Sequence, residues 1–329
     1  MTDISRLYPF DCISGAKKYI TDNSVDLILT DPPYGIKANN LDRHYHRQEK
    51  NIIAGYVEIP QKEYAIFSKK WILQAQRILR PGGSIYIVSG YSNLPEILNA
   101  LRMTTLEERN HIIWKYNFGV HTQKKYISSH YHILFYTKPG AKHTFNTYAR
   151  FGPDEKDSGN GSLNYQDRED VWTINREYKP GEIKNKNELP LNLITKIIQY
   201  SSNEGDLVCD FFLGGFNTAK AAIGLNRRIV GFEVNKKSFQ HHIKEISVLK
   251  AGYLLNELRE GVGQNPVNQG KRWSQTEKKD LKSRFSKLYI KIKHKRETIR
   301  ILEKEFGRGY FSILNQLEKM DISKRKKDK

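Results

Sequence analysis

The sequence predicts an α/β fold, in which a doubly wound and mainly parallel sheet is followed by a small all-α unit. Through the first 255 residues, short apolar segments rich in β-branched residues alternate with segments of helical period. Strands that alternate with helices in this way form parallel sheets with helices on both faces. The last fifth of the chain is instead helical in pattern and basic. We therefore expect a large domain at residues 1–255 and a helical unit at residues 271–329.

Seven segments have the features of strands, because they are rich in β-branched and aromatic residues and end at turn signals. These segments are residues 7–10, 25–30, 84–89, 111–116, 132–137, 207–212 and 228–234. Helices are expected at residues 62–79, 95–101, 191–201, 218–225 and 238–249. The first of these helices places Trp71, Ile72 and Ala75 near the helical period, and a Pro-Gly-Gly turn at Pro81 ends it.

Two stretches interrupt the pattern. Residues 138–170 are rich in Gly, Asn, Asp and Ser, which predicts an insertion, and residues 256–270 have the Gly, Asn and Pro content of a linker. Beyond the linker, apolar positions predict three short amphipathic helices, with Gly307 and Gly309 between the last two. These apolar positions are Trp273, Leu281, Phe285, Leu288, Ile299, Leu302, Phe306, Ile313 and Leu317. A three-helix unit of this size has helix-turn-helix proportions.

The charge of the chain is uneven. The net charge is +19, and residues 271–329 hold 20 Lys and Arg against 8 Asp and Glu. A concentrated basic segment favours a polyanionic partner, and nucleic acid is the first candidate. The alternative is a solvated tail that only increases solubility.

Composition also indicates the compartment. Cys12 and Cys209 are the two cysteines, too few for a disulfide framework, so we expect a reducing, cytoplasmic environment. The N-terminus lacks the regions of a signal peptide, and no apolar run approaches the roughly 18 residues of a membrane span. The His-Tyr-His stretches at 44–46 and 130–132 have no ligand partners at regular offsets, so we expect no metal site.

The tetrapeptide Asp31-Pro32-Pro33-Tyr34 follows a strand-like run at residues 25–30. A carboxylate accepts hydrogen bonds, an aromatic ring stacks, and the two prolines stiffen the turn. This combination suits a site that grips a flat heterocycle by an exocyclic amine. The alternative is an ordinary exit from a strand, because Asp-Pro pairs are common in turns.

A second site is indicated where residues 207–212 lead into the expected helix at 218–225. Gly214 and Gly215 at this turn allow a ligand to approach the backbone, and the helix N-terminus favours negative charge. The next strand ends at Glu233, in the position of an acid that grips ribose hydroxyls. Together they indicate a nucleoside-type cofactor.

From residue 7 to 249 the chain resembles S-adenosylmethionine-dependent DNA amino-methyltransferases of the group in which the catalytic motif precedes the cofactor motif. Asp31, Pro32, Pro33 and Tyr34 match the catalytic tetrapeptide of that family, and the glycine loop follows some 180 residues later. The resemblance implies a Rossmann-like, circularly permuted, seven-stranded methyltransferase sheet. It also implies that residues 138–170 form the target-recognition insertion.

The resemblance further implies a set of cofactor-binding residues. They are Asp11, Cys12, Asp31, Asn187, Glu188, Leu189, Pro190, Asp210, Phe212, Gly214, Gly215, Asn217, Thr218 and Glu233. Two positions depart from the family pattern, since Phe216 replaces the second loop glycine and Leu189 replaces a lysine before Pro190. Either the glycine has shifted to Gly215, which we favour, or cofactor affinity is weak.

The activity implied is methyl transfer from S-adenosyl-L-methionine to N6 of adenine in double-stranded DNA, at a specific site. An Asp at the first position of the tetrapeptide leans toward adenine, and N4 of cytosine or an amine in RNA is the alternative. A third interpretation, motivated by Phe216 and the basic tail, is a DNA-binding protein on a decayed methyltransferase scaffold. A cognate restriction endonuclease and a second copy of the chain are further partners that the resemblance suggests.

Residues 271–329 resemble Myb-like or related helix-turn-helix units, with a recognition helix expected at 311–320. The alternative is a helical hairpin that packs on the catalytic domain or on a second subunit.

Overall fold

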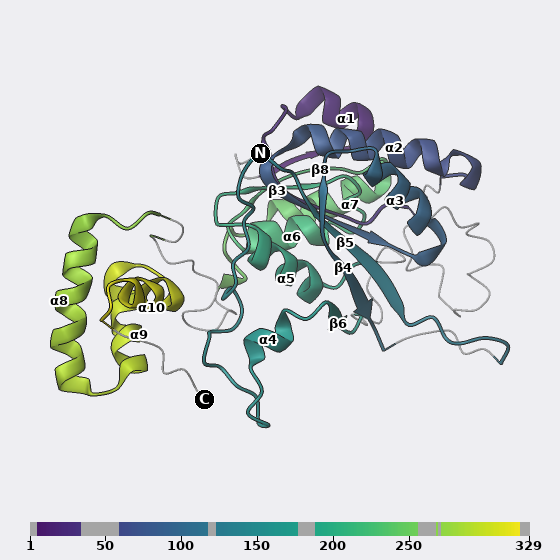
Figure 1. Cartoon of the computed structure of the whole chain (residues 1–329). Coiled ribbons are helices and arrows are strands. Elements are labelled where there is room, and N and C mark those ends of the chain that lie inside the picture. Colours follow the sequence, from purple (N-terminus) through teal and green to yellow (C-terminus); the bar gives the residue numbers. More distant parts are fainter. Residues whose placement is uncertain are drawn as a thin grey trace.

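The computed structural model describes residues 5–33, 59–117, 123–176, 188–255, 268 and 271–322. This part of the chain forms an eight-stranded sheet with helices on both faces, and a separate bundle of three helices (Figure 1). The α/β class is therefore confirmed. None of the helices that the structure describes combines the length and the apolar content that crossing a membrane requires.

The strands are β1 (Ser5–Tyr8), β2 (Val25–Thr30), β3 (Leu79–Ser89), β4 (Glu107–Lys115), β5 (His130–Thr137), β6 (Val171–Thr173), β7 (Leu207–Asp210) and β8 (Arg228–Phe232). The helices around the sheet are α1 (Cys12–Tyr19), α2 (Gln61–Ile78), α3 (Leu94–Arg102), α4 (Leu163–Asp167), α5 (Leu191–Ser201), α6 (Asn217–Gly224) and α7 (Lys236–Ser247). A short 3-10 helix, η4 (Tyr91–Asn93), precedes α3. The bundle consists of α8 (Gln275–Ile292), α9 (Lys295–Phe306) and α10 (Tyr310–Lys319).

The strand order across the sheet is β1-β8-β7-β2-β3-β5-β4-β6. The pairs from β1 to β3 are parallel, and within the described sheet β5 alone runs antiparallel to its two neighbours. The sheet is thus mainly parallel, as predicted. The four neighbouring strands β1, β8, β7 and β2 therefore have their carboxyl ends at the same edge of the sheet.

Each face of the sheet has its own apolar core. Ile28 of β2 packs with Trp71 under α1, α2 and α3. Leu29, the next residue, packs with Ile194 under α5, α6 and α7. Consecutive residues of a strand point to opposite faces, so a run of apolar residues in β2 serves both cores. Burying each such side chain stabilises the fold by about 1.5–3 kcal/mol.

The prediction of seven strands was wrong by one. The eighth strand, β6, lies at the sheet edge and has three residues, which is shorter than the runs of four to eight residues that a strand pattern needs. Two helices, α1 and α4, were also not predicted. The first begins at Asp11, whose carboxylate caps it, and the second has five residues inside the insertion.

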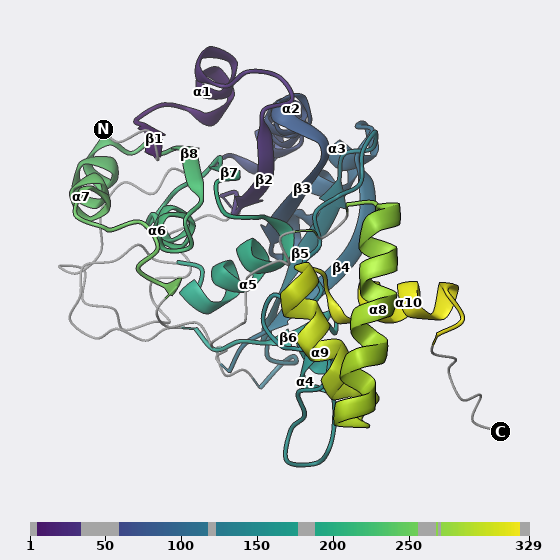
Figure 2. The same cartoon turned by 90° about the vertical axis from the view of Figure 1, so that its left-hand side faces the viewer.

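The bundle has a core of its own. Leu281 and Phe285 of α8 pack against Leu302 of α9 and Leu317 of α10. Figures 1 and 2 both show the three helices beside the segment that carries α4. Arg300 of α9 contacts this segment, with its guanidinium 2.7 Å from the Asp154 carboxylate. Residue 268 alone is described within the predicted linker, so its boundaries stay a prediction.

Candidate active site

The carboxyl ends of β2, β7 and β8 bring the sequence-predicted residues to one edge. Asp31 follows β2, Asp210 ends β7, and Glu233 follows β8. These strands are parallel neighbours, so residues distant in sequence meet there. Open α/β sheets bind their ligands at this edge.

Asp210 connects the two predicted motifs. The Thr30 hydroxyl donates a hydrogen bond of 3.0 Å to Asp210 Oδ1, and the Phe212 N–H donates another of 3.0 Å to the same oxygen. The Thr218 side chain contributes a third. Burial raises the pKa of the Asp210 carboxyl to about 6. This nearly inaccessible carboxyl therefore fastens the strand before Asp31 to the glycine loop.

The tetrapeptide is described in part. Asp31 and Pro33 are half-buried and Pro32 is buried, directly after β2. Proline has no backbone N–H, so Pro32 and Pro33 offer only carbonyl acceptors at this turn. Tyr34, predicted to stack on the target base, lies outside the described residues, as does Asn187 of the predicted cofactor set.

The glycine loop touches the segment that precedes α5. The Glu188 side chain packs directly on the Cα of Gly215, so a side chain added at Gly215 would have to displace it. The Asn217 amide donates a 3.0 Å hydrogen bond to the Leu189 carbonyl, just before Pro190. Backbone and side chain together thus hold the loop against residues 188–190.

Phe216, the departure from the family pattern, points into the core. It is fully buried, and its ring centroid lies 5.6 Å from that of Phe239 and 5.5 Å from that of His242. Its φ of 63° is in the left-handed region that favours glycine. The loop therefore keeps bare backbone at Gly214 and Gly215, which supports the interpretation of a shifted glycine.

Glu233 is half-buried at the end of β8. Its Oε2 accepts the Gly214 N–H at 3.0 Å and its Oε1 accepts the Asn235 N–H at 2.7 Å. Burial raises the pKa of this carboxyl above its ordinary value. Each oxygen retains a second lone pair, so the group can still accept hydroxyl donors.

Three other predicted cofactor residues have structural roles. Asp11 caps α1, accepting the Ile13 N–H at 3.0 Å. Cys12 is buried, which raises the pKa of its thiol. Phe212 packs edge-on against Trp71, with ring centroids 5.5 Å apart. That these residues also contact a cofactor stays a prediction.

An arginine among aromatic rings lies at the same edge and was not predicted. The Arg176 guanidinium lies 4.9 Å from the ring centroid of Tyr116, 5.2 Å from that of Tyr131 and 5.8 Å from that of Trp114. Its buried Nε has no hydrogen-bond partner within the described part of the chain. The rings lie in or directly after β4 and β5, and no local sequence pattern places Arg176 among them.

A cluster of two histidines and a carboxylate lies in α7, where the sequence predicted no metal site. Potential ligand atoms of His241, His242 and Glu245 lie within 4.8 Å of one another. The Lys220 ammonium is 2.8 Å from Glu245 Oε2, and His242 Nδ1 is 3.0 Å from the same oxygen. Lys220 thus pairs with the one carboxylate of this cluster.

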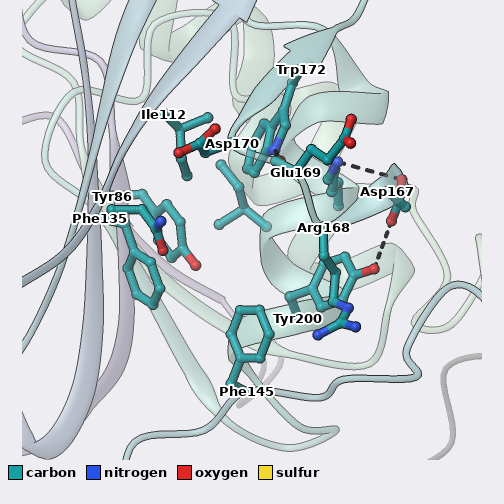
Figure 3. A pocket seen from close by; sticks show the side chains of 13 residues that line it. Tyr86, Ile112, Phe135, Phe145, Asp167, Arg168, Glu169, Asp170, Trp172 and Tyr200 are labelled. Carbon is teal, nitrogen blue, oxygen red and sulfur yellow. Dashed lines mark hydrogen bonds and ion pairs between the residues drawn. The ribbon is translucent and has the colours of Figure 1, made fainter. Parts of the chain in front are cut away.

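A pocket lies between the sheet and α5 (Figure 3). Asp167 accepts a hydrogen bond from the Tyr200 hydroxyl at 2.7 Å and lies 3.4 Å from Lys196 Nζ. Burial lowers the pKa of Lys196 to about 8, and its ammonium lies 4.3 Å from the Trp172 ring centroid. Among the described residues, none of the predicted catalytic or cofactor-binding ones lines this pocket. The contacts of Asp167 with Tyr200 and Lys196 join the insertion to α5.

The fold defines the class first, as an open and mainly parallel α/β sheet with helices on both faces. The structure is similar to the PvuII DNA methyltransferase (cytosine-N4-specific), with a TM-score of 0.57 at 13% identity, covering 78% of this chain and 92% of that one. It is also similar to the M1.HpyAVI–SAM complex, with a TM-score of 0.51 at 21% identity, covering 73% and 98%. At these identities the likeness concerns the fold alone.

Sequence similarity then defines the family. Residues 25–245 match the N6/N4 methyltransferase family model, described as DNA methylase, so the chain belongs to this S-adenosylmethionine-dependent family. The chain is 32% identical over 252 residues to Type II methyltransferase M.BamHI of Bacillus amyloliquefaciens, covering 71% of this chain but only 55% of that protein. It is 30% identical over 278 residues to DNA adenine methyltransferase YhdJ of Escherichia coli (strain K12), covering 80% and 89%.

Proposed function

We propose that this protein transfers a methyl group from S-adenosyl-L-methionine to N6 of adenine in double-stranded DNA. The observation that carries the proposal is the hydrogen bond between Thr30 and Asp210, which fastens the strand end before Asp31 to the glycine loop. An amine-binding carboxylate and a cofactor loop are therefore adjacent at one edge of the sheet.

The residues at this edge fit the cofactor. Bare backbone at Gly214 and Gly215 allows close approach, and the Glu233 carboxylate suits the ribose hydroxyls. Glu188 and Asn217 would hold the methionine end from the opposite side. When bound, S-adenosyl-L-methionine supplies an electrophilic methyl group on a sulfonium.

The chain contributes positioning and electrostatics. The Asp31 carboxylate and the Pro32 carbonyl would accept the two N–H groups of the target amine, leaving its lone pair toward the methyl group. The target base must flip out of the DNA duplex, which costs a few kcal/mol. Stacking on Tyr34, worth about 1–3 kcal/mol, would offset part of this cost.

Adenine is favoured over cytosine by the Asp at the first tetrapeptide position. The sequence relative named a DNA adenine methyltransferase matches over most of both chains, which supports the same choice. N4 of cytosine is the second candidate, because the same two acceptors would hold that amine and a cytosine-N4-specific enzyme shares the fold.

The test is the variant Asp31→Ala. Losing a preorganised acceptor at the reacting amine should lower methyl transfer to plasmid DNA about a hundredfold to a thousandfold. Cofactor binding, measured by calorimetry, should be unchanged. Mass analysis of nucleosides from the treated DNA should show N6-methyladenine.

The matched control is Asp22→Ala, which removes an exposed carboxylate that pairs with Arg77 near the other end of β2. It should retain normal methyl transfer. Full activity of Asp31→Ala would overturn the role of Asp31. Detection of N4-methylcytosine in the treated DNA would show that cytosine, not adenine, is the target. Absence of cofactor binding would favour a decayed scaffold.

We further infer that the protein is a modification enzyme of a restriction system, since M.BamHI is named a type II methyltransferase. The cognate endonuclease, a homodimer, and target reading by residues 138–170 stay predictions. Co-purification from cells expressing the neighbouring genes, and the mass of the complex in solution, would test the first two.

A further inference from the structure

One face of α8 is lined by lysines. Lys279 and Lys282 in the helix and Lys293 directly after it are exposed, and Ser286 lies between them at the surface. Spacings of three and seven residues from Lys279 place Lys282 and Ser286 on the same side of the helix as Lys279. Lys293 caps the C-terminal end of the helix. We call Lys279, Lys282, Ser286 and Lys293 the lysine stripe.

The stripe carries charge that the bundle does not neutralise. Within the described residues, none of its three lysines has an acidic partner. The nearby Arg284, by contrast, pairs with Glu305 of α9, and Glu277 pairs with Arg308. Lysines without a paired carboxylate are groups that contact nucleic-acid phosphates. The Ser286 hydroxyl donates a 3.0 Å hydrogen bond to the Lys282 carbonyl, so the lysines carry the stripe's affinity for phosphate.

The helix α10, where the sequence predicted base recognition, offers less surface. Ile313, Leu314, Gln316 and Leu317 are buried, which leaves Asn315 and Lys319 as its exposed residues among those whose side chains are described. A helix with so few exposed polar groups provides little for phosphate binding. Of the three helices, α8 carries the largest excess of basic over acidic residues.

The position of α8 separates the stripe from the active site. Figure 1 shows α8 on the side of the bundle that faces away from the sheet. The stripe therefore does not compete with residues at the carboxyl ends of the strands. A duplex bound there would extend beyond the segment being methylated.

We propose that the lysine stripe binds the phosphate backbone of duplex DNA outside the methylated segment, and so holds the enzyme on DNA independently of sequence. This inference rests on the proposed function, because it takes duplex DNA as the partner. Lysine–phosphate contacts release counterions, so the contribution of the stripe must depend on salt.

The test is the full-length double variant Lys279→Gln/Lys282→Gln, with a long random-sequence duplex as the probe. The slope of log affinity against log salt concentration should become shallower by about 2, since each lost phosphate contact removes about 0.9. In methyl transfer to plasmid DNA, KM for DNA should rise while kcat at saturating DNA stays unchanged.

The control is Lys287→Gln/Lys291→Gln, which removes the same charge from another side of α8. It should leave the slope within about 0.5 of the wild type, because its lysines contact no phosphate. Equal slopes for the wild type and the stripe variant, or equal losses in both variants, would overturn the proposal. If no form of the protein methylates DNA while only the stripe variant has a shallower slope, the proposed function fails and this inference survives.

Discussion

The cofactor edge of the sheet and the C-terminal bundle place their charged groups differently. At the edge, Asp210 is buried and Glu233 is half-buried, and both accept hydrogen bonds from the chain itself. In the bundle the core is apolar and the stripe lysines are exposed, with Arg308 as a buried exception. Single substitutions should therefore have large effects at the edge, whereas the bundle surface should respond only to several charges at once.

The largest expected effect is that of Phe216→Ala at the edge. Removing a fully buried ring that packs on Phe239 and His242 should lower the free energy of unfolding by about 3–5 kcal/mol. Urea denaturation measures this loss. Affinity for S-adenosyl-L-methionine should also fall, because the ring anchors the glycine loop.

Phe216→Gly separates packing from backbone strain. It loses the same ring but relieves the left-handed conformation, in which a side chain costs roughly 1–2 kcal/mol. It should be more stable than the alanine variant by about 1 kcal/mol. If alanine proves the more stable, the conformation at this position is not the one described.

A smaller effect is expected for Asp210→Asn, and it depends on pH. The pKa of the wild-type Asp210 carboxyl is about 6 in the folded protein, whereas its ordinary value is 3.8. Between these two pH values the folded protein keeps the proton and the unfolded protein has released it. Wild-type stability should fall as pH rises from about 4 to about 6, by on the order of 3 kcal/mol. The variant lacks this titration.

Thermal unfolding of both proteins between about pH 4 and pH 7 measures the difference. Asp210→Asn should gain stability relative to the wild type as pH rises through the interval, because the wild type then carries a buried charge. Parallel curves for the two proteins would show that Asp210 does not titrate in this range.

The smallest single-site effect is expected in the bundle, for Arg308→Lys. The guanidinium lies 4.2 Å from the ring centroid of Trp273 and donates hydrogen bonds to Glu277 and to the Lys271 carbonyl. Lysine keeps the charge but loses the planar fork, at a cost of about 1.5–3 kcal/mol. Hydrogen exchange should accelerate in α8 and α10 and stay unchanged in α5.

Much of the arrangement at the carboxyl ends of the strands could be predicted from sequence. Alternating strands and helices fix the parallel order, and parallel order brings Asp31, Gly214 and Glu233 together. The hydrogen bond between Thr30 and Asp210 could not be predicted, because it joins residues 180 positions apart. Phe216 was anticipated as a departure, but the left-handed backbone that accommodates it requires the structure.

The bundle was predicted as three helices but its surface was not. Periodicity identified the core positions, including Leu281, Phe285 and Leu317, all of which are buried. The same pattern cannot tell which exposed face binds a partner, since every amphipathic helix has a polar side. Only the packing of the three helices shows that α10 is largely buried, whereas α8 exposes more basic side chains than either other helix.

The strand order has a consequence for the synthesis of the protein. The first strand, β1, has β8 as its neighbour in the described sheet, and β8 ends at Phe232. On the ribosome, β1 must therefore stay unpaired until most of the catalytic domain has been synthesised. The central strand β7 is also synthesised late. Until it emerges, the edge of β2 that pairs with β7 has no partner. A nascent chain thus carries Asp31 long before Asp210 and Gly214, so the edge at which we propose the active site is complete only when translation of the domain is nearly finished.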